Sequence, residues 1–292
     1  ESWSETAKLL FDKSKKIFMI FTGSSALNLE LSVDAVRRTT KETVFPMNFS
    51  EYLTLKHENW LPPKGTADAV RRMIFEGDHN SVIDYAVSKE NELTKNILEI
   101  EGIIEKKWED FVCHKGFPFS LNMPQIETHE KIFNMIDRVI EKDIFAIKSF
   151  DAETRNTISR ILTFLALQSP GGTSDAKLSD RLGVSPTTIR SILDVLEKTH
   201  LIFSIKPYGR AGKIVRKSWK YYFLSPSINA AIRFKLGAYD VNNKDMLGVF
   251  VENLVASSLI RMKETVNLPT GIFYDSEDEG VDFVIQDSKE NI

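Results

Sequence analysis

The 292-residue chain contains a single cysteine, Cys113, and no long apolar run. One cysteine cannot form an internal disulfide, which favours a reducing compartment such as the cytoplasm. The longest purely apolar run, from Ile17 to Phe21, is far shorter than the roughly 20 residues that span a bilayer. No basic-then-apolar leader is visible at the start. We therefore expect a cytoplasmic protein that has no membrane partner.

Neither sign of charge dominates the sequence. The chain has 38 Lys and Arg against 41 Asp and Glu, which gives a formal net charge of −3. This balance excludes a uniformly basic coat for nucleic acid, although it leaves room for a local basic patch. Apolar residues make up 42% and charged residues 27%, the proportions of an ordinary globular protein. A largely disordered, collagen-like or coiled-coil chain is excluded, and the length predicts two or three domains.

Periodic patterns predict many helices and few strands. Residues 15–21 form a continuous apolar run before a Gly-Ser turn, which is typical of a strand in a parallel sheet covered on both faces. Asn48, with Glu51 three residues later, predicts the start of a helix. Both ends are abrupt: the first residue is not methionine, and an alternating strand at 281–286 lacks a following partner. We expect a fragment of a longer chain rather than a natural protein with short ends.

The clearest local pattern is a helix-turn-helix over residues 176–202. Gly183 suits the end of its first helix, and Ser185 with Pro186 suits the start of the second. The inward positions of the second helix are apolar, as a recognition helix requires; they are Ile189, Leu193 and Leu196. A strand that begins at Leu201, followed by a turn at 208–212, predicts a winged helix.

The outer face of this helix and the wing supply candidate DNA contacts. From Lys206 to Lys220 there are six basic residues and no acid, enough to neutralise several phosphates. The candidate DNA-binding residues are Thr187, Thr188, Arg190, Ser191, Arg210, Lys213, Arg216 and Lys217. A winged helix that docks on protein, with the basic run as a solvated face, explains the same pattern. Double-stranded DNA and a protein partner both stay open, as does an oligomer.

Seven short segments, in order along nearly the whole chain, resemble a known family. They are Thr22-Gly-Ser-Ser, Phe45-Pro-Met-Asn-Phe-Ser-Glu-Tyr-Leu, Lys115-Gly-Phe-Pro, Asp137-Arg-Val-Ile-Glu-Lys-Asp-Ile, Lys220-Tyr-Tyr-Phe-Leu, Gly248-Val-Phe-Val-Glu-Asn-Leu-Val and Gly280-Val-Asp-Phe-Val-Ile. Together they resemble the prokaryotic, often archaeal, AAA-type ATPases that carry a C-terminal domain of unknown function 4143. The Gly-x-x-x-x-Gly-Lys-Thr loop of that family has no counterpart in this sequence.

The resemblance implies a multi-domain α/β plus α protein. Its parts would be the C-terminal part of an AAA-type ATPase core (1–60), a helical lid (61–150), a winged helix (151–220) and an incomplete nuclease-like α/β domain (221–292). It also implies ATP and Mg²⁺ as ligands, and a nucleotide state coupled to DNA or partner binding. Whether this chain hydrolyses ATP stays open. The alternatives are a non-catalytic winged-helix regulator that binds DNA, and an interaction scaffold.

The same resemblance assigns roles near the N-terminus. Ser24 and Ser25, at a strand end, match a position that senses the γ-phosphate, and they equally suit the cap of a following helix. Arg37 and Arg38 match an arginine that acts on the nucleotide of a neighbouring subunit. An exposed pair of helix arginines is the alternative for these two.

Near the C-terminus, Glu252 and Asp282 resemble the first two acids of a restriction-endonuclease-like fold, where two carboxylates hold Mg²⁺. The acid and lysine of the next strand are absent, so we expect no nuclease activity from this chain. The five histidines and Cys113 lack metal-ligand spacing and are interpreted as ordinary core or surface residues.

Overall fold

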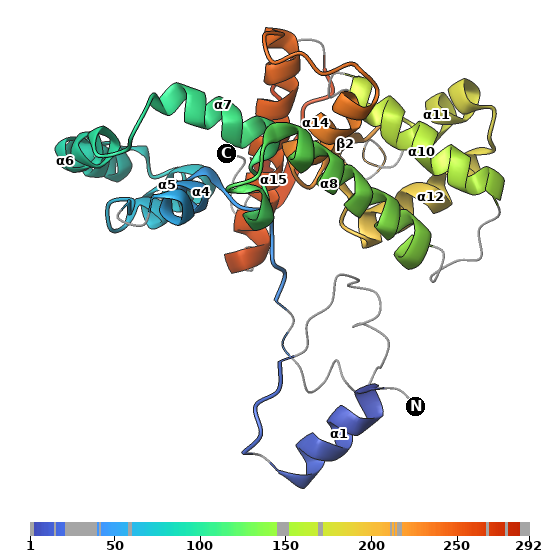
Figure 1. The fold of residues 1–292 in the computed structure, drawn as a ribbon, viewed down its shortest axis with the longest axis horizontal. Coiled ribbons are helices and arrows are strands. Elements are labelled where there is room, and N and C mark those ends of the chain that lie inside the picture. Colours follow the sequence, from blue (N-terminus) through green and yellow to red (C-terminus); the bar gives the residue numbers. More distant parts are fainter. Residues whose placement is uncertain are drawn as a thin grey trace.

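A computed structural model describes residues 3–14, 16–20, 40, 42–57, 60–144, 152–168, 172–210, 212, 214, 218–266, 269–277 and 280–286 (Figure 1). This part of the chain is mainly helical, with one small mixed sheet. Within these ranges, no helix combines the length and the apolar character of a bilayer span.

The helices carry most of the chain. Their bounds are α1 Trp3–Lys13, α4 Phe49–Lys56, α5 Thr66–Glu76, α6 His79–Leu98, α7 Ile104–His114, α8 Gln125–Arg138, α10 Ala152–Leu167, α11 Asp175–Leu182, α12 Pro186–Lys198, α14 Pro226–Lys235 and α15 Lys244–Val266. A 3₁₀ turn, η1 (Pro118–Ser120), precedes α8, and a π-helical turn, η2 (Val139–Ile144), follows it.

The sheet contains β1 (Ile202–Pro207), β2 (Lys220–Phe223), β3 (Gly271–Tyr274) and β4 (Val284–Gln286), in the order β2-β1-β3-β4. Strand β1 is antiparallel to β2 and parallel to β3, and β3 is antiparallel to β4. The sheet therefore joins the hairpin that follows the helix-turn-helix to the two strands near the C-terminus.

The predicted helix boundaries are confirmed where a capping residue marks them. Asn48 and Glu51 form a reciprocal capping box at the start of α4. Gly183 ends α11 with a φ of 69°, the left-handed region that suits glycine. The Ser185 hydroxyl accepts a hydrogen bond from the backbone N–H of Thr188 and caps α12. These signals depend on local chemistry alone, which is why the sequence reveals them.

Helix α14 lies at the centre of the packing. Every residue from Pro226 to Ile232 is buried, and the helix packs against α7, α8, α10 and α15. One core extends from Ile132 of α8 through the helix-turn-helix to Ile232. A second joins α4 and α7 to α15, and a third lies between the sheet, α15 and Phe75 of α5. The cores cross the boundaries at 150 and 220 that the resemblance implies.

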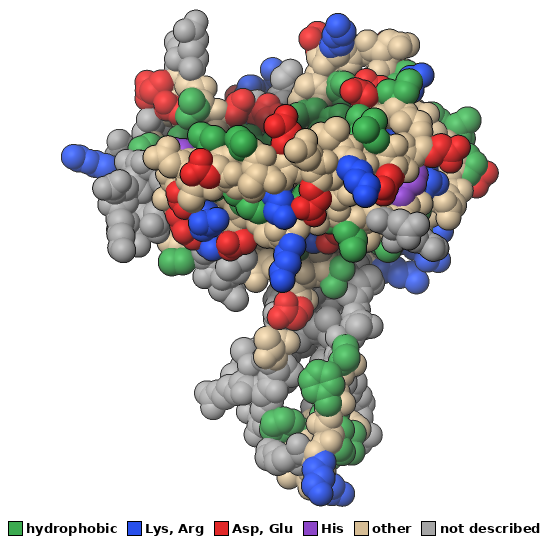
Figure 2. All heavy atoms as spheres, turned by 90° about the vertical axis from the view of Figure 1, so that its left-hand side faces the viewer, with side chains coloured by type: hydrophobic (Ala, Val, Ile, Leu, Met, Phe, Trp, Pro, Cys, Tyr) green, Lys and Arg blue, Asp and Glu red, His purple; other side chains and the backbone are tan. Residues whose placement is uncertain are grey.

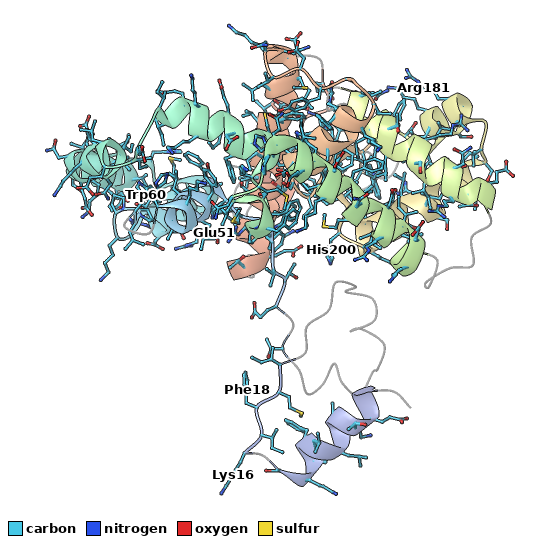
Figure 3. The ribbon with its side chains drawn as sticks, in the orientation of Figure 1. Lys16, Phe18, Glu51, Trp60, Arg181 and His200 are labelled. Atoms are coloured by element: carbon cyan, nitrogen blue, oxygen red, sulfur yellow. The ribbon has the colours of Figure 1, made fainter. Side chains whose placement is uncertain are left out.

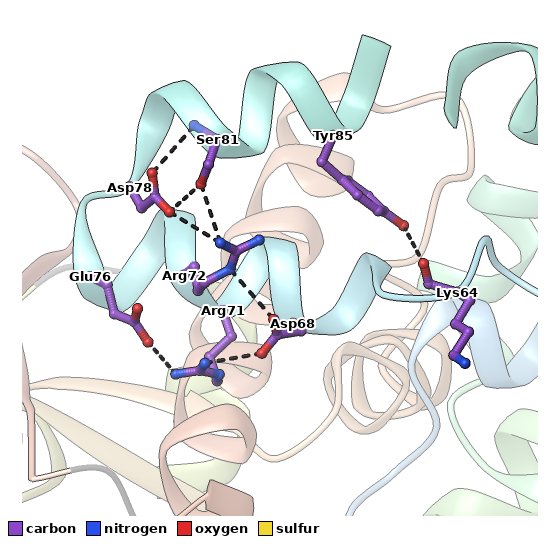
Figure 4. Close-up of polar contacts among 8 residues, drawn as sticks. All are labelled: Lys64, Asp68, Arg71, Arg72, Glu76, Asp78, Ser81 and Tyr85. Atoms are coloured by element: carbon purple, nitrogen blue, oxygen red, sulfur yellow. Dashed lines mark hydrogen bonds and ion pairs between the residues drawn. The ribbon is translucent and has the colours of Figure 1, made fainter. Parts of the chain in front are cut away.

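Helices α5 and α6 form an outlying hairpin that is joined by polar contacts (Figure 4). Arg72 of α5 pairs with Asp78 at the start of α6, with 3.2 Å between Nη1 and Oδ2. The Tyr85 hydroxyl of α6 donates to the Lys64 carbonyl at 3.0 Å. Of the 20 residues of α6, only Val82 is buried. Exposed ion pairs contribute little stability, whereas Phe75 of α5, which is 2% exposed, joins the hairpin to the third core.

The prediction of a strand at residues 15–21 is wrong for residues 16–20, which are the part of this segment that the structure describes. Residues 16–20 lie outside the sheet and form no strand. Phe18 is 88% exposed and Ile20 75% exposed. Phe18 lies far from the body of the molecule, as does α1 (Figure 3). An apolar run is a buried strand only where neighbouring strands cover it, and the described residues place none beside this segment.

Candidate functional site

The structure describes only some of the predicted site residues. Those outside the described residues are Ser24, Ser25, Arg37, Arg38, Lys213, Arg216 and Lys217. Those it describes are Thr187, Thr188, Arg190, Ser191, Arg210, Glu252 and Asp282. The described set falls into two places, the helix-turn-helix and a charged cluster beside β2.

The helix-turn-helix is followed by a hairpin, in the order expected of a winged helix. Helices α10, α11 and α12 precede the antiparallel pair β1 and β2. Thr173, between α10 and α11, forms an isolated antiparallel bridge with Trp219 and so adds a third strand position. The turn between β1 and β2 carries Arg210, which is exposed.

Helix α12 presents its first turn to solvent. Thr187 is exposed, and Thr188 is half-buried with its hydroxyl 2.9 Å from that of Ser185. The opposite face is fully buried, because Ile189 and Leu193 are both 0% exposed. The predicted inward positions are confirmed. An open helix N-terminus with hydroxyl side chains is suited to contact phosphate.

The side chain of Arg190 does not face outward as expected, because it pairs with Asp175. Its Nε donates to Asp175 Oδ2 at 2.8 Å. Its guanidinium lies 4.4 Å from the centre of the Trp219 ring, and 36% of the side chain remains exposed. The longer reach of arginine lets it fold back across the α11–α12 junction. Ser191 beside it is half-buried.

Residues 219–223 present two different sets of side chains to two sides of the sheet, because successive strand residues alternate. Trp219 and Tyr221 pack into the core of the helix-turn-helix. Lys220 and Tyr222 point to the other side, where both bond to Glu252 of α15. This short segment therefore contacts both the candidate DNA-binding helices and the C-terminal part of the chain.

Glu252 and Asp282 both pair with one ammonium group. Lys220 Nζ is 2.9 Å from Asp282 Oδ1 and 3.3 Å from Glu252 Oε1. The Tyr222 hydroxyl donates to Glu252 Oε1 at 2.8 Å. The structure brings the two acids to one cation, Lys220, which is 62 positions from Asp282 and was not among the predicted site residues. The alternation along β2 is the signal that could have found it.

This donor set does not fit a resident Mg²⁺. The ammonium of Lys220 is paired with both carboxylates and repels a cation there, whereas Mg²⁺ needs near-octahedral oxygen ligands. Within the described part of the chain, no group of three or more His, Cys, Asp or Glu side chains is placed to hold a metal ion. The geometry favours an ion-pair cluster over the metal ligands that the resemblance implied for Glu252 and Asp282.

A second polar cluster lies inside the molecule, between α7, α8 and α14. His129 is 0% exposed, and in the described chain neither ring nitrogen has a hydrogen-bond partner. Its ring stacks on Phe234, with 4.8 Å between centroids, and lies 5.0 Å from Tyr239. Burial, with smaller contributions from the nearby His114 and Lys115, lowers the pKa of His129 to about 4. His129 is therefore a neutral core residue.

Charge is unevenly distributed along the chain. Residues 151–220 contain twelve Lys and Arg against six Asp and Glu, a net charge of +6, although the whole chain carries −3. The remaining residues together carry −9. Figure 2 views the end of the molecule formed by α5 and α6, where acidic and basic side chains are intermixed. The positive excess belongs to the helix-turn-helix and its hairpin.

Comparisons with known proteins find similarity to one domain model and to two other proteins. Residues 105–239 match the sequence model of a domain of unknown function, DUF8612. An uncharacterized protein of Methanocaldococcus jannaschii is 30% identical over 283 residues, which are 97% of this chain and 56% of that protein. An uncharacterized protein of Haemophilus influenzae is 27% identical over 204 residues, 67% of this chain and 48% of that protein.

The chain thus spans about half the length of the curated relatives it matches. No solved structure matches it. The segment that matches the domain of unknown function begins in α7 and ends just after α14. It includes the helix-turn-helix and the His129 cluster, and it excludes Glu252 and Asp282.

These matches show that the predicted assignment to the AAA-type ATPases is wrong. The seven segments behind it are each only four to nine residues long, and segments this short recur in unrelated proteins. The phosphate-binding loop, the motif most specific to such an ATPase, does not occur in the sequence. The expectations of ATP, Mg²⁺ and nucleotide sensing by Ser24, Ser25, Arg37 and Arg38 came from the resemblance and have no other support.

The charged cluster predicts unequal effects of its members on stability. Lys220→Met leaves Glu252, which is 20% exposed, without its cation, so we expect a loss of about 2 kcal/mol in the free energy of unfolding. Asp282→Asn changes a side chain that is 60% exposed and should cost less than about 1 kcal/mol. Urea denaturation measures both. Equal losses would show that Lys220 is not the centre of the cluster.

The His129 cluster predicts a specific dependence of stability on pH. The unfolded chain binds a proton at His129 below about pH 6.5, whereas the folded chain does so only near pH 4. Stability should therefore fall as the pH drops from about 6.5 to 4, by about 3 kcal/mol in total. His129→Phe should remove this contribution in denaturation experiments across that range. His79→Gln, on the exposed face of α6, is the control and should leave the profile unchanged.

Proposed function

We propose that residues 152–223 form a winged-helix module that binds double-stranded DNA, mainly through phosphate contacts. The observation that carries this proposal is the net charge of +6 on the segment 151–220, in a chain whose remainder is acidic. Phosphate neutralisation by Lys and Arg is the main source of affinity for DNA. The positive segment includes a helix-turn-helix with an open helix N-terminus, which is the part of such a fold that enters a groove.

The exposed side chains of the module suit a nucleic acid. Thr187 lies at the start of α12, Arg181 is exposed at the end of α11, and Arg210 is exposed in the turn after β1. Lys206 extends over the Trp219 ring, with 4.7 Å from Nζ to its centre. These groups come from three elements and supply hydroxyl and cationic donors to a phosphate backbone.

The protein-docking alternative has less support at this surface. Among the described residues from 172 to 223, no large hydrophobic side chain is exposed. Protein interfaces are usually anchored by buried aromatic or aliphatic side chains. Among the described residues, most exposed apolar side chains lie outside the module, for example Ile83 and Val87 on α6, and Leu167 at the end of α10 lies within it. DNA binding is therefore the function that the geometry of α12 supports best.

The contacts expected at bases are few. The groups at the open end of α12 are the hydroxyls of Thr187 and Thr188, and threonine reads bases with little selectivity. Arg190, the residue best suited to recognise guanine, is paired with Asp175. We therefore expect modest sequence preference, with affinity set mostly by ionic contacts.

This proposal predicts salt-dependent DNA binding that is localised to the module. With three to four phosphate contacts, affinity for a 20-base-pair duplex should fall on the order of 100-fold between 50 and 200 mM salt. Thr187→Glu and Arg210→Glu should each weaken binding by about tenfold or more in fluorescence anisotropy. Lys95→Glu, an exposed charge reversal on α6, is the matched control. The proposal would be contradicted if affinity did not change with salt concentration, or if Lys95→Glu weakened binding as much as Thr187→Glu and Arg210→Glu do.

A further inference from the structure

Arg190 and Asp175 form an ion pair across the junction of α11 and α12. Asp175 is the first residue of α11, and Arg190 is the fifth of α12. Arg190 Nε donates to Asp175 Oδ2 at 2.8 Å, and Asp175 Oδ1 is buried with no hydrogen-bond partner in the described chain. The carboxylate therefore binds its arginine through one oxygen only.

Two cationic side chains share one aromatic ring beside this pair. The Arg190 guanidinium and the Lys206 ammonium lie 4.4 and 4.7 Å from the centre of the same Trp219 ring. The Arg190 side chain is 36% exposed and the Asp175 side chain 22%. The guanidinium is therefore the more accessible member of the pair, and an anion in solution can reach it.

A phosphate offers the Arg190 guanidinium the same kind of partner as Asp175 does. Guanidinium binds the paired oxygens of carboxylate or phosphate through its planar fork. Stacking on Trp219 fixes the guanidinium beside α12 whichever anion it binds. The two anions cannot both take the same donors, so they compete.

We infer that Asp175 is a built-in competitor that withholds Arg190 from DNA phosphate. This inference rests on the proposed DNA-binding function and names the residue that restrains it. In the free protein, Asp175 pairs with Arg190. When DNA binds, a phosphate takes the guanidinium, and the bond from Nε to Asp175 is exchanged for bonds to phosphate oxygens. Asp175 also repels the incoming phosphate by its own charge, so it lowers affinity in two ways.

The inference predicts a gain of affinity from removing an acid of the binding module. Asp175→Asn should tighten binding to the 20-base-pair duplex about fivefold to tenfold at 100 mM salt. It should also steepen the salt dependence by about one phosphate contact. Asp175→Glu, which keeps the charge, should bind no more tightly than the original chain. Asp180→Asn, on the exposed side of α11, is the matched control and should gain less than twofold.

A double-mutant cycle separates the release of Arg190 from a general change in charge. In the Arg190→Gln background, Asp175→Asn should change affinity by less than twofold, because no guanidinium is left to release. An equal gain in both backgrounds would overturn the inference. Asp175→Ser provides a second neutral variant, should Asp175→Asn fold poorly by circular dichroism and thermal melting.

The outcomes distinguish this inference from the function on which it rests. If the original chain binds the duplex and Asp175→Asn leaves the affinity unchanged or lowers it, the inference about Asp175 is wrong and the proposal of DNA binding stands. If neither the original chain nor any variant binds the duplex, both claims fall. A gain that depends on Arg190, in a chain whose binding depends on salt, supports both.

Discussion

The alternation of side chains along residues 219–223 is the constraint on which the rest of the structure depends. A strand must point successive residues to opposite faces. Here one face contributes Trp219 and Tyr221 to the core of the helix-turn-helix. The other contributes Lys220 and Tyr222 to the bonds with Glu252 of α15. Because this one short segment contacts both parts, the helix-turn-helix and the C-terminal strands cannot separate without losing the contacts of residues 219–223.

This arrangement packs together parts of the chain that the resemblance would assign to different domains. Helix α14, directly after β2, is buried from Pro226 to Ile232 and packs against α7, α8, α10 and α15. The helices before residue 150 and those after it share one core around it. The charged cluster at Lys220 joins β2 to α15, and the neutral His129 cluster joins α8 to α14.

Local signals in the sequence predicted what depends on local chemistry. The caps at Asn48, Gly183 and Ser185 and the buried face of α12 needed only residue type and spacing. The strand at 15–21 failed because burial depends on neighbours that the pattern does not contain. Arg190 and Lys220 were misjudged or missed because their partners lie 15 and up to 62 positions away. Short motifs similar to an ATPase family were misleading for the same reason: local similarity does not fix the whole chain.

The central claim is that the basic segment acts as a DNA-binding surface through the first turn of α12 and the turn after β1. Hydrogen exchange of the intact chain, with and without a DNA duplex, tests it most directly. The account predicts slower exchange at the amides of residues 185, 187–190 and 208–210 when DNA is bound, and no change in α5 or α6. Protection confined to α5 and α6, or no protection at saturating DNA, would contradict it.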